Sequence, residues 1–230
     1  MSIPLDRGRH KTILVQLLKD IYQDSNIAAC LGFKGGTAAF LFYSLDRFST
    51  DLDFDLLDDN KADLVFERVQ SIASQYGVIR QATRKRFTLL IVLSYESGAT
   101  QIKIEINQRS FGSRYEILTY LGISMLVMIQ PDMYAHKLMA MYERIGKTSR
   151  DIYDVWFFLR HNWPINRQIV EQRSGLPFRS LVGECISKIQ NVSDRAILTG
   201  LGELLTQAQK DQVKSKLRED TVFLLRLLVE

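Results

Sequence analysis

The chain of 230 residues is 46% hydrophobic and 24% charged, a composition typical of a folded globular protein that excludes extended disorder. Its 30 basic and 26 acidic residues give a net charge of +4, which is compatible with a polyanionic partner but does not require one. Two cysteines are too few for a disulfide framework, and the polar start and the absence of a long apolar run exclude a signal peptide and a membrane span. We therefore expect a cytoplasmic protein with no membrane partner.

Hydrophobic periodicity predicts a mixed first half. Apolar residues at helical spacing indicate an amphipathic helix, and a short apolar run then leads into two glycines, a second helix and a second strand. The expected elements are a helix over 9–24, a strand over 27–33, a helix over 37–45, a strand over 52–57, a helix over 60–76, and strands over 77–81, 87–95, 100–107 and 115–120.

From residue 131 onward the pattern becomes helical, which predicts an α+β fold with a mixed sheet flanked by helices and a helical C-terminal half. We expect helices over 131–145, 149–160, 166–174, 180–190, 194–205 and 209–229. The predicted boundary separates an α/β core, 1–130, from a helical region, 131–230.

Asp51 and Asp53 are the most informative pair in the chain. Successive side chains of a strand alternate between its faces, so these two carboxylates point the same way, roughly 7 Å apart at the β-carbons. Unpaired carboxylates repel each other, and a divalent cation converts that repulsion into a binding site. Carboxylate oxygens with room for water and phosphate favour Mg²⁺ or Mn²⁺ over zinc.

Gly35, Gly36 and Thr37 precede this pair at the expected start of a helix. Glycines let a backbone approach an anion closely, and a helix N-terminus offers unpaired amides to phosphate. By itself a Gly-Gly pair indicates only a turn. The acidic pair one helix and one return strand later makes a phosphate site the stronger interpretation.

Glu105 supplies a third carboxylate on an alternating strand. It either lies exposed beside Lys103 or belongs to the site, and the second interpretation requires its strand to neighbour the strand of Asp51 and Asp53. Three such acids would hold two metal ions. The histidines, His10, His136 and His161, appear isolated in the sequence.

Lys137 and the pair Asp151 and Asp154 lie on predicted helices. From the residues alone Lys137 is a surface charge, and the two aspartates favour a helix N-terminus, where negative charge is stabilised by about 0.3–1 kcal/mol. A role in chemistry stays open at this point.

Four ordered motifs over about residues 30–160 carry a specific resemblance. They are Lys34-Gly35-Gly36-Thr37, Arg47-Phe48-Ser49-Thr50-Asp51-Leu52-Asp53-Phe54, His136-Lys137-Leu138-Met139-Ala140 and Arg150-Asp151-Ile152-Tyr153-Asp154-Val155. Together with Glu105 they resemble the nucleotidyltransferase fold of the DNA polymerase beta superfamily. Within it they are similar to the AbiEii/AbiGii toxin family, also called type IV toxin nucleotidyltransferases.

The resemblance implies roles for these residues. Asp51, Asp53 and Glu105 would bind metal, Gly35, Gly36 and Thr37 would cradle nucleotide phosphates, Lys137 would neutralise phosphate charge, and Asp151, with Asp154, would complete the catalytic site from the helical half. Arg47 would either bind nucleotide or anchor the turn before the strand.

The function implied is a Mg²⁺- or Mn²⁺-dependent nucleotidyltransferase that moves a nucleoside monophosphate from an NTP to an acceptor hydroxyl. RNA, such as a tRNA end, is the implied acceptor, and the implied role is that of the toxin in a toxin–antitoxin or phage-defence pair, with an antitoxin protein as partner. Two alternatives remain: a small-molecule nucleotidyltransferase of the antibiotic-modifying type, and a non-catalytic nucleotide-binding module.

Overall fold

A computed structural model describes residues 4–230, and these form two compact units. The N-terminal unit comprises Met1–Ser110 and Arg114–Met128, and the C-terminal unit comprises Phe111–Ser113 and Ile129–Glu230. Each unit is described by itself below.

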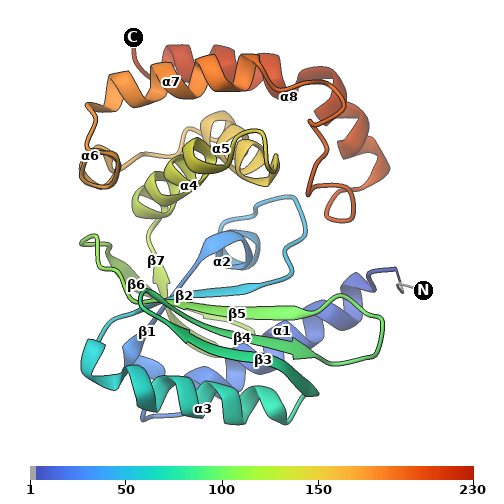
Figure 1. The fold of residues 1–230 in the computed structure, drawn as a ribbon, viewed down its shortest axis with the longest axis vertical. Coiled ribbons are helices and arrows are strands. Elements are labelled where there is room, and N and C mark those ends of the chain that lie inside the picture. Colours follow the sequence, from blue (N-terminus) through green and yellow to red (C-terminus); the bar gives the residue numbers. More distant parts are fainter. Residues whose placement is uncertain (1–3) are drawn as a thin grey trace. The chain divides into compact units, whose positions relative to one another are not determined.

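A seven-stranded mixed sheet forms the centre of the N-terminal unit, with strand order β3-β4-β5-β2-β1-β7-β6 (Figure 1). The strands are β1 (Leu31–Lys34), β2 (Leu52–Leu56), β3 (Val78–Lys85), β4 (Thr88–Ser94), β5 (Ile102–Asn107), β6 (Tyr115–Tyr120) and β7 (Ile123–Met128). Two neighbouring pairs, β2 with β5 and β1 with β7, are parallel, and the other pairs are antiparallel. The parallel pairing of β2 with β5 brings together segments about fifty residues apart.

Three α-helices cover this sheet: α1 (Arg7–Gln23), α2 (Gly35–Phe42) and α3 (Ala62–Ser74). Helices α1 and α3 pack against each other, and α2 lies on the opposite side of the sheet from α3 (Figure 1). Alternation along the strands explains the core, because the apolar residues of β2 and β5 are buried while their polar residues face the other side.

The C-terminal unit is built from five helices that bury a continuous apolar core. They are α4 (Gln130–Arg144), α5 (Arg150–Arg160), α6 (Arg167–Ser174), α7 (Phe178–Gln190) and α8 (Gln207–Leu227). Helix α5 is almost fully buried, and Phe158 on it stacks on Trp163 with ring centroids 4.0 Å apart. Within residues 4–230, none of the helices has the length and apolar character needed to cross a bilayer.

Most predicted elements are present, and three predictions need correction. The strand predicted over 27–33 begins only at Leu31, because Ala28–Cys30 forms a 3-10 turn. Strand β7 was not predicted. The helix predicted over 194–205 is wrong: this segment is a series of turns, in which Gly200 has a φ of +76°. A left-handed residue interrupts a right-handed helix, so the apolar residues of this segment lie on a series of turns instead of one helix.

Candidate active site

Strands β2 and β5 bring Asp53 and Glu105 side by side. Asp53 pairs directly with Glu105 in the parallel register, and paired residues of neighbouring strands project from the same face. Asp51 lies two residues before Asp53 on that face, and its Oδ1 accepts a hydrogen bond from the Lys103 backbone N–H at 3.2 Å. The sheet therefore places all three predicted metal ligands on one face, which we call the acid face.

The acid face has the donor chemistry of a site for a hard divalent cation. Asp51 and Asp53 are half-buried and Glu105 is exposed, so their carboxylate oxygens lie near solvent. Within residues 4–230, however, no three His, Cys, Asp or Glu side chains converge closely enough to hold a metal ion as they stand. The backbone register fits a metal site, and metal binding requires the side chains to turn toward a common point.

Two glycines open α2 against the acid face. Gly35 has a φ of +78°, and a β-carbon added there would lie 2.8 Å from Cβ and Cγ of Asp53. A β-carbon on Gly36 would lie 2.8 Å from Nη2 of Arg47 and 2.9 Å from Oγ of Ser49. Because such contacts are too short, a side chain at Gly35 would displace Asp53 and one at Gly36 would displace the ends of Arg47 and Ser49. The positive φ at Gly35 also favours glycine, and the positive end of the α2 dipole lies beside Asp53.

Thr37 and Arg47 hold the segment that leads into β2. The buried Thr37 hydroxyl donates to the Asp51 backbone carbonyl and lies 2.9 Å from the Ser49 hydroxyl. Arg47 is only 3% exposed, and its Nη1 donates to the Phe48 carbonyl at 2.9 Å. Of the two alternatives for Arg47, these contacts favour anchoring of the turn. A contact of Thr37 with phosphate stays a prediction.

A fourth carboxylate on the acid face, Asp55, was not singled out in the sequence. It accepts hydrogen bonds from Lys34 Nζ at 2.5 Å, Asn107 Nδ2 at 2.6 Å and the Tyr115 hydroxyl at 2.6 Å. In the antiparallel register of β1 and β2, Lys34 is the backbone neighbour of Asp53, while its ammonium reaches Asp55. The strand alternation that predicted the face of Asp51 and Asp53 also applies to Asp55. The hydrogen-bond partners of Asp55, however, come from three other strands, β1, β5 and β6.

His10 is not isolated, in contrast to its appearance in the sequence. It is fully buried, with Nε2 3.0 Å from the Thr50 carbonyl and Nδ1 2.9 Å from the Tyr95 hydroxyl. Since a carbonyl only accepts, Nε2 carries the proton and Nδ1 accepts from Tyr95. Burial lowers the pKa of His10, against the opposing effect of its Thr50 hydrogen bond and the charge of Asp51. The neutral ring thus fixes the residue that precedes Asp51.

In the C-terminal unit, Lys137 on α4 forms ion pairs with both aspartates of α5. Its Nζ lies 2.8 Å from Oδ2 of Asp154 and 3.3 Å from Oδ1 of Asp151. Arg144 Nη2 lies 2.9 Å from Oδ2 of Asp151, within ion-pair distance although not aligned as a hydrogen bond. Both carboxylates are buried. The Lys137 ammonium is held in one place by two helices.

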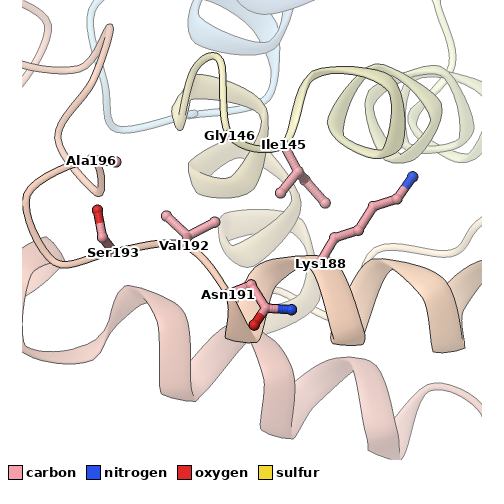
Figure 2. A pocket seen from close by; sticks show the side chains of 7 residues that line it. All are labelled: Ile145, Gly146, Lys188, Asn191, Val192, Ser193 and Ala196. Atoms are coloured by element: carbon pink, nitrogen blue, oxygen red, sulfur yellow. The ribbon is translucent and has the colours of Figure 1, made fainter.

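A surface hollow of about 470 Å³ also lies in the C-terminal unit (Figure 2). Its lining residues are Ile145, Gly146, Lys188, Asn191, Val192, Ser193 and Ala196. No predicted site residue is among them, and only one ionisable side chain contributes. The hollow therefore adds nothing to the proposed chemistry.

Solved structures share this fold. JHP933 from Helicobacter pylori matches with a TM-score of 0.60 and 19% sequence identity, over 99% of this chain and 94% of that chain. An antigenic nucleotidyltransferase-like protein from Paracoccidioides brasiliensis matches with a TM-score of 0.51 and 14% identity, over 81% of this chain and 91% of that chain. At these identities the similarity shows the fold, which is that of the nucleotidyltransferases.

The sequence shows the family. The family described as nucleotidyl transferase AbiEii toxin, type IV TA system, matches residues 16–175, more than half of the chain. The chain belongs to this family of nucleotidyltransferase toxins, as the four motifs predicted. No curated protein matches its sequence.

Proposed function

We propose that the protein transfers a nucleoside monophosphate from an NTP to a hydroxyl of RNA, such as a tRNA end, as the toxin of a toxin–antitoxin or phage-defence pair. One observation carries the proposal: Asp53 pairs with Glu105 directly beside the glycine start of α2. Carboxylates for a cation and a helix N-terminus for phosphate then meet in one place.

The reaction balances without covalent participation of the protein. The acceptor oxygen bonds to the α-phosphorus while the bond from that phosphorus to the oxygen bridging to the β-phosphate breaks. Pyrophosphate leaves with the electron pair, and the hydroxyl proton passes to a carboxylate of the acid face or to water. Positioning and charge neutralisation supply most of the rate acceleration.

Within this proposal, Asp51, Asp53 and Glu105 hold Mg²⁺ or Mn²⁺, because carboxylate oxygens are the donors that these ions prefer. Such an ion supplies positive charge to the triphosphate and acidifies the acceptor hydroxyl. Gly35 and Gly36 provide backbone amides for the phosphates, and Thr37 and Arg47 keep the chain before Asp51 in place.

Lys137 is assigned to phosphate neutralisation. Asp154 and Asp151 lie within ion-pair distance of its Nζ and are themselves buried, which supports a role in holding the ammonium. Under this assignment the two aspartates position Lys137 and do not contact the nucleotide.

Substitution of the acid face tests the function. Asp51→Asn and Asp53→Asn should abolish incorporation of labelled nucleotide into total RNA, while Asp59→Asn, an exposed control in the same unit, should leave it unchanged. Circular dichroism checks that all three variants fold. Retained transfer in either acid-face variant would contradict the site.

Two further readouts separate the alternatives. An RNA acceptor gives a steep dependence of affinity on salt, because each phosphate contact releases counterions, whereas a small-molecule acceptor gives a shallow one. Calorimetric NTP binding without pyrophosphate release would favour the non-catalytic module. Incubation with a co-expressed candidate antitoxin tests the partner, since inhibition of transfer is the expected result.

A further inference from the structure

An exposed aromatic side chain lies close to two guanidinium groups at the turn from β3 to β4. This turn consists of Arg86 and Phe87, and the Phe87 ring remains 45% exposed. The guanidinium carbon of Arg86 lies 4.9 Å from the ring centroid, and that of Arg109 lies 5.7 Å from it. Two-residue turns favour glycine, asparagine and aspartate, so the turn itself does not require a phenylalanine.

The segment after β5 holds this turn in place. The Gln108 backbone N–H donates to the Phe87 carbonyl at 3.0 Å, and the Gln108 side-chain amide donates to the Lys85 carbonyl at 3.1 Å. Arg109 Nε donates to Oδ1 of Asn107 at 3.4 Å. The backbone of the turn is thus tied to the segment after β5, and one side-chain contact restrains Arg109.

The basic residues near Phe87 differ from their neighbour Arg84 in whether they form ion pairs with carboxylates. Lys85, Arg86 and Arg109 are exposed, and among residues 4–230 no carboxylate forms an ion pair with Lys85 or Arg86. Arg84, the next residue along β3, instead pairs with Asp63 and Glu67 of α3. At the tip of the hairpin, the charges of Lys85 and Arg86 are therefore not neutralised by an ion pair within the described part of the chain, whereas the charge of Arg84 is.

The register connects this cluster to the acid face. Lys85 pairs with Thr88, Thr88 pairs with Asn107, and Asn107 pairs with Asp55, so Lys85 projects from the same face as the carboxylates. Two strand spacings and two residue steps put Lys85 about 12 Å from Glu105. That span corresponds to about three or four stacked nucleotides.

We propose that Lys85, Arg86, Phe87 and Arg109 bind the single-stranded part of an RNA acceptor, about three or four nucleotides from the reacting hydroxyl. The inference rests on the proposed function and specifies where the acceptor lies. A base stacks on Phe87 and on the guanidinium planes, and Lys85 contacts phosphate. A peptide of acidic residues alone would offer charge but no aromatic ring to stack.

Direct binding without NTP tests the site. The probes are fluorescein-labelled oligouridylates of about three and about twelve nucleotides, titrated in fluorescence anisotropy. Phe87→Ala should weaken binding of the long probe about tenfold, and Phe87→Trp should restore it. Arg86→Gln should weaken binding and reduce the magnitude of the slope of log affinity against log salt by about 0.7. Arg84→Gln removes the same charge from the same hairpin and should leave both the affinity and the slope unchanged.

The outcomes separate this site from the proposed function. Loss of long-probe binding in Phe87→Ala and Arg86→Gln but not in Arg84→Gln supports the site, even if wild-type protein transfers nothing to RNA and the proposed function fails. Transfer to RNA by wild type with equal efficiency in Phe87→Ala overturns the site and leaves the function standing. Absent binding of the long probe by wild type, or equal competition by polyglutamate, also overturns the site.

Discussion

Replacing Gly35 by alanine tests whether the turn at the start of α2 sets the position of Asp53. The chain offers a control, because Gly35 and Gly122 have nearly the same left-handed φ, +78° and +79°. A β-carbon at Gly35 meets Asp53, but one at Gly122 meets nothing within 4 Å. Both variants therefore place a β-carbon on a residue with left-handed φ, and only Gly35→Ala adds the collision with Asp53.

The magnitudes follow from these contacts. A non-glycine residue in left-handed conformation costs about 1–2 kcal/mol, so both variants should lose that much unfolding free energy. The added β-carbon of Gly35→Ala lies 2.8 Å from Cβ and Cγ of Asp53, against 3.4–4 Å for ordinary contact. Asp53 must therefore retreat by roughly 0.6 Å or more, and misplacement on the scale of 1 Å costs about a hundredfold in rate.

Urea unfolding gives the stability loss, and incorporation of labelled nucleotide at a temperature where both variants are folded gives the rate. We expect Gly122→Ala to transfer at nearly the wild-type rate and Gly35→Ala to transfer about ten- to a hundredfold more slowly. Equal rates in the two variants would refute the close approach of α2 to Asp53 as a determinant of activity.

Two further predictions concern buried groups. Burial lowers the folded-state pKa of His10 below 6.5, so its contribution to stability is present above pH 6.5 and is lost as the pH falls through the folded pKa. The melting temperature, measured between pH 7.5 and 5, should therefore fall more steeply with pH in wild type than in His10→Asn. Equal pH slopes of the melting temperature would contradict this prediction. Lys137→Met leaves buried carboxylates without this cation and should lower the free energy of unfolding by about 3–5 kcal/mol, measured by chemical denaturation. The shape-conserving Asp154→Asn should lower it less. The reverse order would mean that the ion pairs do not hold Lys137.

The sequence predicted what is local to one strand or one helix. The alternation around Asp51 and Asp53 and around Glu105 is a property of single strands, so the face of each was predictable. That these strands are parallel neighbours depends on the order of the whole sheet, which the resemblance implied and spacing did not. His10 was missed for the same reason, because its partners Thr50 and Tyr95 lie 40 and 85 residues away.

Strand β7 and the segment 194–205 show the limit of periodicity. The turn before β7 contains Leu121 and Gly122, both with positive φ. A single glycine is a weak indication of a turn, and the apolar leucine beside it favours a continuous strand instead. In 194–205 the apolar spacing suits a helix, but Gly200 is left-handed. In both places the left-handed conformation of one or two residues outweighs the hydrophobic pattern.

The carboxylates of the acid face differ in their hydrogen-bond partners, although they are of the same chemical type. Asp55 accepts from a lysine, an amide and a phenol at 2.5–2.6 Å, so its charge is compensated and it ties β2 to β1, β5 and the start of β6. Asp53, two residues earlier, is half-buried and lies beside the exposed Glu105. Like charges in adjacent register repel each other, so a nearby cation would stabilise this pair. The same strand thus ties itself to its neighbours with Asp55, and under the proposed function Asp51 and Asp53 are the carboxylates that would bind a divalent ion.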